Sequence, residues 1–411
     1  MRRDVFPKVR AIPAACCLVI ALMLLAAPAM AATTQVNVTK YCDNNYSTAV
    51  KTANLTVANL MANYTQVYSN GPLYMQKGTF DLNDTWGDAN QGMVYYGEHN
   101  GTYVSNITGE VGGMSDGDEL WVLGIDKPIT RYFGYDNVYT PNSRQGDMIL
   151  AWWDNETGLA GNTWNSGLCL FFYTPPSVYG FADSLNLTNR DMEASFDSWY
   201  QRFVPDKYNV SALYPAANGL SVKNVTDLLI YPPHRYDFNT TGDTDEWAYE
   251  GGVSGVPTSA TVPSTAFSST SEIADNDSSV YWTNTTDDGK YAAQRFVFTL
   301  KESAANVERL NVTWKGSGTH DNVSATQGAD LYIWNGGSSS YEKLADTSSN
   351  STTTLTGGNA SVATNYVVDG NVTVLVMQKS AQQPVGEDGK YYSHLATDHV
   401  KLVVTHHHSN S

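Results

Sequence analysis

Short apolar runs separated by turn residues dominate the chain after residue 280. The strand-like runs are QRFVFTL, VERLNVTW, ADLYIWNG, NYVVDGNVTVLVMQ and HVKLVVTH. In VVDGNVTV an Asp-Gly pair lies between β-branched runs, which is a strong signal for a β-hairpin. Short strands at this regular spacing predict an all-β domain over residues 280–405, a two-sheet sandwich of the jelly-roll kind.

Residues 32–250 mix helical and strand-like periods, so we predict an α+β domain. In STAVKTANLTVANLMANY the apolar residues recur at helical spacing, with Ser47 as the expected N-cap. A second amphipathic helix is expected in DMEASFDSWYQRF, residues 191–203. The dense apolar runs ELWVLGI, MILAWW and LCLFFY predict buried strands.

Composition marks a boundary between these regions and at both ends of the chain. Residues 251–279 are rich in Ser, Thr, Pro and Gly and contain no Lys or Arg, which is typical of a linker. Residues 1–31 combine a basic start, an apolar run and Ala29-Met30-Ala31, and therefore predict a cleaved signal peptide. The apolar run is also about long enough to span a bilayer, which leaves a retained N-terminal anchor open. Residues 406–411, HHHSNS, are expected to be a flexible tail or the vestige of a cloning tag.

Net charge excludes some classes of partner. The chain carries a formal charge of -17, and the expected signal peptide contributes about +3, so the mature chain is nearer -20. Such acidity disfavours nucleic acid and anionic lipid as partners. It suits a solvated outer surface on which carboxylates are bridged by cations.

Sugar-acceptor triplets are about three times as frequent as chance predicts. With 33 asparagines and 75 serines plus threonines in 411 residues, random order gives about six N-x-[ST] triplets, whereas the chain has nineteen. We expect a secreted, heavily glycosylated protein. Asn54 lies close to the apolar face of the expected first helix, so its site is expected to stay unmodified. The other triplets start at Asn37, Asn45, Asn63, Asn83, Asn100, Asn106, Asn155, Asn186, Asn209, Asn224, Asn239, Asn276, Asn284, Asn311, Asn322, Asn350, Asn359 and Asn371.

Catalytic signatures are missing from the sequence. It contains no HExxH, GxSxG, Walker loop, CxxC or CxxCH motif. The adjacent pairs His320-Asp321 and Asp398-His399 fit parts of a catalytic triad but are more typical of surface turns. His99, His234 and His394 are scattered along the chain. We therefore expect no enzymatic activity and no catalytic residue, although paired carboxylates for glycoside hydrolysis are not visible in sequence spacing.

Carboxylates in Gly-containing turns are the candidate metal ligands. Ca²⁺ takes six to eight oxygen ligands, and loops of this kind expose both carboxylates and carbonyls. None of the three clusters matches a full twelve-residue Ca²⁺ loop, so a solvated turn is the alternative for each. A structural Ca²⁺ is therefore the one cofactor considered. The candidate ligands are Asp116, Asp118, Asp243, Asp245, Asp287 and Asp288.

Two cysteines, Cys42 and Cys169, remain after the expected signal peptide. In an oxidising exterior the simplest expectation is a single disulfide between them, and two buried thiols are the alternative.

Aromatic residues are abundant, with 26 Tyr and 10 Trp. Exposed Tyr and Trp stack on sugar rings in carbohydrate-binding modules, and they also serve protein–protein contacts. Both uses remain open.

Residues 36–200 also carry a family resemblance. The stretch VGGMSDGDELWVLGIDKPITRYFGYDNVYTPNSRQGDMILAWWDNETG, followed by GLCLFFYTPPSVYGFADS, resembles a domain common in secreted surface proteins of methanogenic archaea. More faintly it is similar to the molybdopterin-binding domain of sulfite-oxidase-like enzymes. That likeness implies a cofactor cysteine in an active-site loop, and neither Cys42 nor Cys169 occupies such a loop, so the activity is not carried over.

The second part, with LNVTWKGSG and DLYIWNGGSSSYEKL, resembles galactose-binding-like sandwich domains of the same archaeal proteins. As a whole the chain resembles methanogen surface-layer (S-layer) glycoproteins, such as those of Methanospirillum-like organisms. The resemblance implies an extracellular structural protein of the archaeal cell envelope. Its expected partners are further copies of itself in cyclic rings of a lattice, covalent glycans, and the membrane only through an anchor or spacer. The alternative is a secreted carbohydrate-binding protein or polysaccharide-acting enzyme.

Overall fold

A computed structural model gives the fold. It describes residues 32–43, 46–69, 73–76, 79–81, 93–125, 131–141, 145–160, 166–173, 213–215, 217–239, 245–274, 276–359, 363–385 and 389–406. The expected signal peptide or anchor, the expected helix 191–203 and the last five residues of the tail lie outside this part of the chain. So do Asp243 and the sequons at Asn45, Asn83, Asn186 and Asn209.

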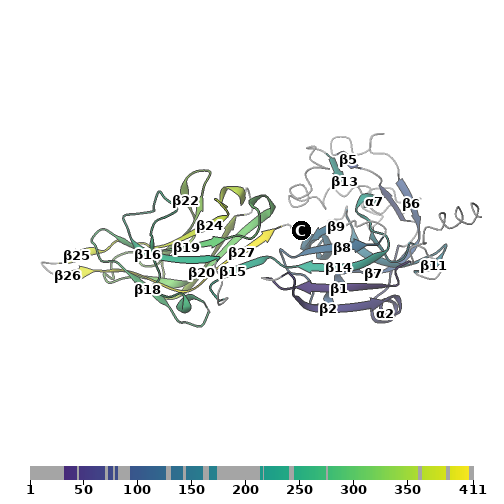
Figure 1. Ribbon diagram of the computed structural model, residues 1–411, viewed down its shortest axis with the longest axis horizontal. Helices are drawn as coiled ribbons and strands as arrows, with labels where there is room; N and C mark the ends of the chain where they lie inside the picture. The colour runs from purple at the N-terminus through teal and green to yellow at the C-terminus, as the bar shows by residue number, and fades with distance from the viewer. Residues whose placement is uncertain are drawn as a thin grey trace, which may run out of the picture.

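The described chain forms two bodies placed end to end, with the C-terminal strand β27 running back toward the first body (Figure 1). The first body has two main sheets. One runs in the order β2 (Ala49–Thr56), β1 (Gln35–Tyr41), β14 (Val225–Tyr231), β8 (Glu119–Gly124) and β9 (Arg131–Gly134). β1 and β14 are parallel, and the other pairs are antiparallel.

The second main sheet of this body runs in the order β11 (Gly158–Leu159), β10 (Asp147–Asp154), β7 (His99–Tyr103) and β3 (Val67–Tyr68), with β12 (Cys169–Tyr173) also paired to β10. The first body also contains two separate two-stranded sheets: β13 (Leu213–Pro215) with β5 (Thr79–Asp81), and β4 (Leu73–Gln76) with β6 (Met93–Gly97). Every residue of β12 is buried, as expected for a strand covered on both faces. The buried strands predicted from ELWVLGI, MILAWW and LCLFFY are therefore confirmed as β8, β10 and β12.

The expected α+β character of the first body is not confirmed in its described part. The described helices are short: α2 (Val57–Asn63), α3 (Val104–Gly109), α4 (Tyr135–Tyr139) and α7 (Ala217–Leu220). The helix expected from Ser47 onward is wrong over its first half, because residues 49–56 form β2. Thr56, not Ser47, is the N-cap, and it makes a capping box with Asn59. Seven residue pairs with β1 hold this segment as a strand, which overrides its helical apolar spacing.

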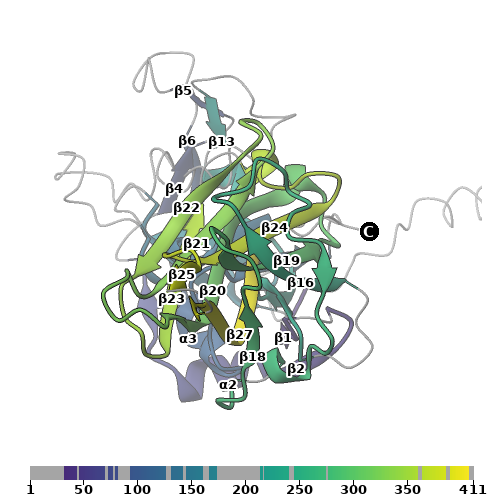
Figure 2. The same ribbon diagram turned by 90° about the vertical axis from the view of Figure 1, so that its left-hand side faces the viewer.

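The second body is a β-sandwich, as the strand spacing predicts, and it faces the viewer in Figure 2. One sheet runs β15 (His234–Asp237), β27 (Ser393–His406), β20 (Val307–His320) and β23 (Thr353–Asn359), with β18 (Tyr281–Asn284) also on β27. The other runs β17 (Thr265–Ala266), β16 (Glu246–Val253), β19 (Tyr291–Thr299), β24 (Asn371–Gln378), β21 (Ala329–Asn335) and β22 (Ser340–Thr347). A small pair joins β25 (Gln383–Val385) and β26 (Gly389–Tyr391), and 3-10 turns cover Ser271–Ile273, Ala304–Asn306 and Ala363–Asn365.

Apolar residues at alternate positions along the strands form the core of this sandwich. Phe296 and Phe298 from β19 and Leu310, Val312 and Trp314 from β20 have essentially no exposed surface. Burying a side chain of this size contributes about 1.5–3 kcal/mol each. Because successive strand residues point to opposite faces, the period of two in VERLNVTW is what directs one set inward.

The turn predicted at Asp369-Gly370 is confirmed. Both residues have positive φ, +50° and +78°, as a two-residue hairpin turn of the primed type requires. Val368 and Asn371 close it with reciprocal backbone hydrogen bonds of 2.9 Å. The arm before the turn does not continue as a strand, because residues 363–365 form a 3-10 turn.

Residues 251–279 are not a linker between the bodies. Their first residues belong to β16, β17 pairs with that strand, and Ile273 is fully buried in the sandwich core. The Arg295 side chain, itself buried, donates hydrogen bonds to the carbonyls of Pro263 and Ala260 at 2.8 and 3.1 Å. A Ser/Thr/Pro-rich composition matches a linker, but these tertiary bonds hold the segment on the sheet. The second body accordingly begins at β15 rather than at residue 280.

The expected disulfide between Cys42 and Cys169 does not form. Leu168, beside Cys169, donates its backbone N–H to the Thr33 hydroxyl, two residues before β1, whereas Cys42 follows the end of that strand. A strand of seven residues rises about 3.3 Å per residue, so more than roughly 20 Å separates the two cysteines. A disulfide requires Cα atoms within about 7 Å.

Candidate functional site at the junction of the two bodies

Two prolines, Pro232 and Pro233, connect the last strand of the first body to the first strand of the second. Beside this crossing Asp116 of the first body makes a 2.9 Å ion pair with Arg309 of the second. Gly117 lies against Pro233 and Thr405, so close that an added Cβ would come within 2.8 Å of the Pro233 ring. The bodies are therefore in direct contact along the crossing.

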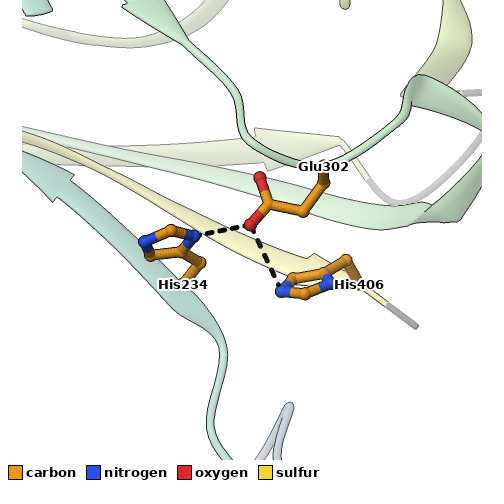
Figure 3. A group of neighbouring side chains, drawn as sticks. All are labelled: His234, Glu302 and His406. Atoms are coloured by element: carbon orange, nitrogen blue, oxygen red, sulfur yellow. Dashed lines mark hydrogen bonds and ion pairs between the residues drawn. The ribbon is translucent and has the colours of Figure 1, made fainter. Parts of the chain in front are cut away.

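Three titratable side chains converge at this junction: His234, Glu302 and His406 (Figure 3). His234 begins β15, His406 ends β27, and Glu302 follows β19. The Nδ1 atom of His234 lies 2.6 Å from Glu302 Oε1, and Nε2 of His406 lies 3.4 Å from the same oxygen. All three side chains are only 5% exposed. Strand pairing brings the two histidines together, because His234 lies opposite Val404 in the β15–β27 register.

Tyrosine hydroxyls complete the polar shell. Tyr236 donates to Glu302 Oε2 at 2.7 Å and accepts from the Lys301 backbone N–H at 2.8 Å. From the first body, the Tyr46 hydroxyl lies 3.0 Å from His406 Nε2 and donates to the Pro232 carbonyl at 3.1 Å. The Glu302 carboxylate is thus held by Tyr236 within the second body, whereas His406 is also contacted by Tyr46 of the first body.

The carboxylate of Glu302 is ionised in this setting. Burial acts to raise its pKa, but the hydrogen bond with His234, the electrostatic interactions with His406 and His234 and the Tyr236 hydroxyl outweigh it and lower the pKa to about 2. Burial and the nearby Glu302 charge raise the pKa values of Tyr46 and Tyr236, so both hydroxyls stay protonated and can donate. Chemically, the site offers two imidazole nitrogens and one carboxylate at a single point.

Sequence reasoning missed this site. In the sequence His234 is one of the scattered histidines, His406 falls in the expected tail, and Glu302 belongs to no recognisable motif. The structure instead makes His406 the last residue of a 14-residue strand, buried at 6% exposure. Some 68 residues separate His234 from Glu302, so no local spacing signals their contact.

The candidate Ca²⁺ ligands do not gather at one point among the described residues. Asp116 and Asp118 line a cleft between the bodies together with Asp136, Glu308 and Arg309. Asp118 is buried and lies 3.2 Å from the Lys40 amine, while Asp116 pairs with Arg309. In the second body Asp245 pairs with Lys301 at 3.2 Å.

The last cluster lies in the turn between β18 and β19. Asp288 accepts from Gln382 at 2.8 Å, and Asp287 accepts from Thr286 at 3.2 Å. Four of the six candidates, Asp116, Asp118, Asp245 and Asp288, thus contact a cationic or amide side chain of the protein itself. The calcium site remains a prediction.

The adjacent His-Asp pairs are not joined into a triad by any described contact. His394 Nε2 lies 2.9 Å from Asp321, and Asp398 pairs with Lys315 at 2.5 Å. His320 is bonded to the Ala381 carbonyl and the Asn322 backbone N–H. Each pair therefore serves to hold a loop or strand end.

Side-chain exposure is described for fourteen of the nineteen sequon asparagines: nine are exposed, four are half-buried and one, Asn224, is buried. Asn54, expected to lie on a helix face, is instead exposed on β2 and donates to Asn37 at 2.8 Å. The exposed group is Asn37, Asn54, Asn63, Asn106, Asn155, Asn239, Asn276, Asn284 and Asn350. Potential glycan sites thus face solvent on both bodies.

Within the described ranges, no helix has both the length and the apolar character needed to cross a membrane.

One family model matches most of the second body. Residues 243–406 match a family model described as "Uncharacterized protein, C-terminal domain". This range runs from just before β16 to the end of β27 and includes both Glu302 and His406. Among solved structures the chain is similar to the CBM22-1 xylan-binding domain from Paenibacillus barcinonensis Xyn10C, at 7% identity and a TM-score of 0.21, over 42% of this chain and 94% of that chain. No curated protein matches the sequence.

Proposed function

We propose that the chain is a structural glycoprotein of an archaeal cell envelope, whose copies assemble into a two-dimensional surface layer. The observation that carries the proposal is the distribution of its sequons, nine of which present an exposed asparagine on one or other of the two bodies. An excess of acceptor sites that also face solvent is what a protein coated with sugar requires.

Rigidity of the subunit supports the same role. In a lattice the subunit itself sets the distance between neighbouring contacts, so the two bodies must keep a fixed position relative to each other. The part-buried contacts of Tyr46 with His406 and Pro232, together with the Asp116–Arg309 pair, supply such a connection. Identical subunits satisfy one another's surfaces by cyclic symmetry, and a second contact between rings extends them into a sheet.

Acidity opposes close packing of the subunits, so a divalent cation at the exposed carboxylate turns is part of the proposal. The test is electron microscopy of purified, glycosylated protein concentrated with and without Ca²⁺, together with imaging of the native cell surface. Ordered arrays that contain this protein are the expected result. A monomer in both conditions, with no array on the native surface, would refute the layer.

Carbohydrate binding is the second candidate, and a specific side chain favours it. Trp282 on β18 is 50% exposed, and Asn284, two residues on, is exposed as well. Asn284 is hydrogen bonded to His394 at 2.6 Å, so an aromatic face has polar groups beside it. An exposed ring with adjacent polar groups suits stacking against a sugar.

Titration with soluble oligosaccharides, followed by tryptophan fluorescence, tests this candidate. Binding should be lost in Trp282→Ala and retained in Trp247→Ala, a matched variant because Trp247 is 41% exposed on the other sheet. Equal behaviour of the two variants would argue against a site at Trp282.

A further inference from the structure

The His234–Glu302–His406 cluster has features that a hydrogen-bond network alone does not require. Within the described part of the chain, these are the three His, Cys, Asp or Glu side chains whose ligand atoms lie within 4.8 Å of one another. His234 Nδ1 and His406 Nε2 both point at the same carboxylate oxygen of Glu302, as Figure 3 shows. Each residue comes from a different strand or loop, so the fold itself assembles the set.

We propose that this cluster binds a divalent transition metal ion of the zinc class. Its ligands are His234 Nδ1, His406 Nε2 and a carboxylate oxygen of Glu302. The Tyr46 hydroxyl, which lies 3.0 Å from His406 Nε2, is the candidate for the fourth ligand.

Donor chemistry selects this class of metal. Imidazole nitrogen suits zinc, copper, iron and nickel, whereas calcium and magnesium take oxygen ligands. Two histidines and one glutamate, with a fourth position left for another ligand, form a donor set that zinc accepts in tetrahedral geometry. A carboxylate among the ligands offsets part of the charge that a buried cation brings.

Both distances from the Glu302 oxygen are close to those that an occupied site requires. Zn–N and Zn–O bonds of about 2.0–2.2 Å in a tetrahedron place neighbouring ligand atoms roughly 3.3 Å apart. His406 Nε2 and Glu302 Oε1 already stand at 3.4 Å. The His234–Glu302 hydrogen bond of 2.6 Å must lengthen by roughly 0.7 Å to reach the same separation.

Metal entry also displaces protons. The ion takes the lone pair of His234 Nδ1, so the proton now shared with Glu302 is released to solvent, and any proton on His406 Nε2 leaves likewise. Binding should therefore weaken as the pH falls. Because the ligands belong to the second body and Tyr46 to the first, the bound ion would stabilise the junction.

The experiment uses the full chain, stripped with chelator and then titrated with Zn²⁺ by calorimetry. The expected result is one tight equivalent and a higher melting temperature. Losing an outer partner of a metal site already costs 10–100-fold in affinity. Glu302→Gln and His406→Gln, each removing a direct ligand, should therefore weaken binding by at least about a hundredfold. His394→Gln, a partly exposed histidine on the same strand, is the matched control and should bind as the wild type does.

The tail histidines need a control of their own, because His407 and His408 follow the site directly. A His407→Ala/His408→Ala double variant should retain the tight equivalent. Binding lost in that variant but kept in Glu302→Gln would overturn the proposal, and so would the absence of tight binding by the wild type.

A spectroscopic readout covers the case in which a ligand variant does not fold. Co²⁺ added to the wild-type protein should give the intense visible bands of a four-coordinate site, and these should disappear on addition of Zn²⁺. An octahedral spectrum, or bands that follow the tail histidines, would count against the site.

Discussion

The hydroxyl of Tyr46 lies 3.0 Å from Nε2 of His406, although 360 residues separate the two along the chain. One belongs to the loop between the first two strands of the first body and the other ends the last strand of the second. The contact therefore exists only when both bodies are folded and in place.

Tyr46→Phe should weaken the junction without disturbing either core. The variant removes the hydroxyl from His406 and from the Pro232 carbonyl, and a lost buried hydrogen bond costs about 1–2 kcal/mol of unfolding free energy. Denaturant unfolding in the presence of chelator measures the change. Tyr68→Phe is the control, since Tyr68 is 60% exposed and its hydroxyl donates to Gln66, which is itself exposed; it should change stability by less than about 0.5 kcal/mol. Equal losses in both variants would contradict the prediction.

Gly117→Ala should push the two bodies apart. Gly117 has φ +91°, a region that favours glycine, and its new methyl group would lie 2.8 Å from Pro233 and 3.1 Å from Thr405. We expect a loss of about 1–3 kcal/mol and a larger radius of gyration in X-ray scattering.

Gly112→Ala separates the effect of backbone strain from the effect of the clash with Pro233 and Thr405. Gly112 has a similar φ of +97°, but an added Cβ there meets no atom within 4 Å. It should share the backbone strain and keep the wild-type shape. A change of shape in Gly112→Ala, or none in Gly117→Ala, would show that Gly117 does not set the spacing of the bodies.

The sequon at Asn224 should be unoccupied, although its triplet is intact. Asn224 is 3% exposed with φ +49°, and its Oδ1 accepts a hydrogen bond from the Thr33 backbone N–H at 3.2 Å. A glycan would be attached to the Asn224 Nδ2 atom, and this buried position leaves no room for it in the folded first body. Glycopeptide mass spectrometry of the native protein should find sugar at exposed sites such as Asn63 and none at Asn224. A glycan mapped to Asn224 in folded protein would refute the assignment.

Acid should destabilise the first body through His99. The ring is 1% exposed, and burial lowers its pKa below the usual 6.5, with Asp154 at 3.5 Å opposing the shift. The unfolded chain then binds more protons than the folded one below pH 6.5, so stability is lost as the pH falls through that value. The slope from this one group is at most about 1.4 kcal/mol per pH unit.

Unfolding measured from pH 8 down to pH 5 should therefore be less pH-dependent in His99→Gln than in the wild type. The proton resonances of His99 should also titrate below the range of an exposed histidine. An unchanged slope in the variant would exclude His99 as the source of acid sensitivity.

Local patterns in the sequence determined much of the secondary structure. The period of two in VERLNVTW, the Asp369-Gly370 pair and the dense runs of β8, β10 and β12 all give the elements that they predict. Each depends on neighbours along the chain: a pleated strand alternates its side chains, and a positive φ favours Gly, Asn or Asp. The sandwich of the second body follows from strands of this kind in close succession.

Only the tertiary structure decided the remaining features. Residues 49–56 follow a helical pattern but pair with β1, and residues 251–279 have linker composition but are held by Arg295 and the sandwich core. Asn224 has the same triplet as its exposed counterparts, yet packing buries it. His234, Glu302 and His406 lie far apart in sequence and meet because β15 pairs with β27 beside the loop after β19. Long-range backbone pairing and burial set these positions, and neither is encoded in a short window of residues.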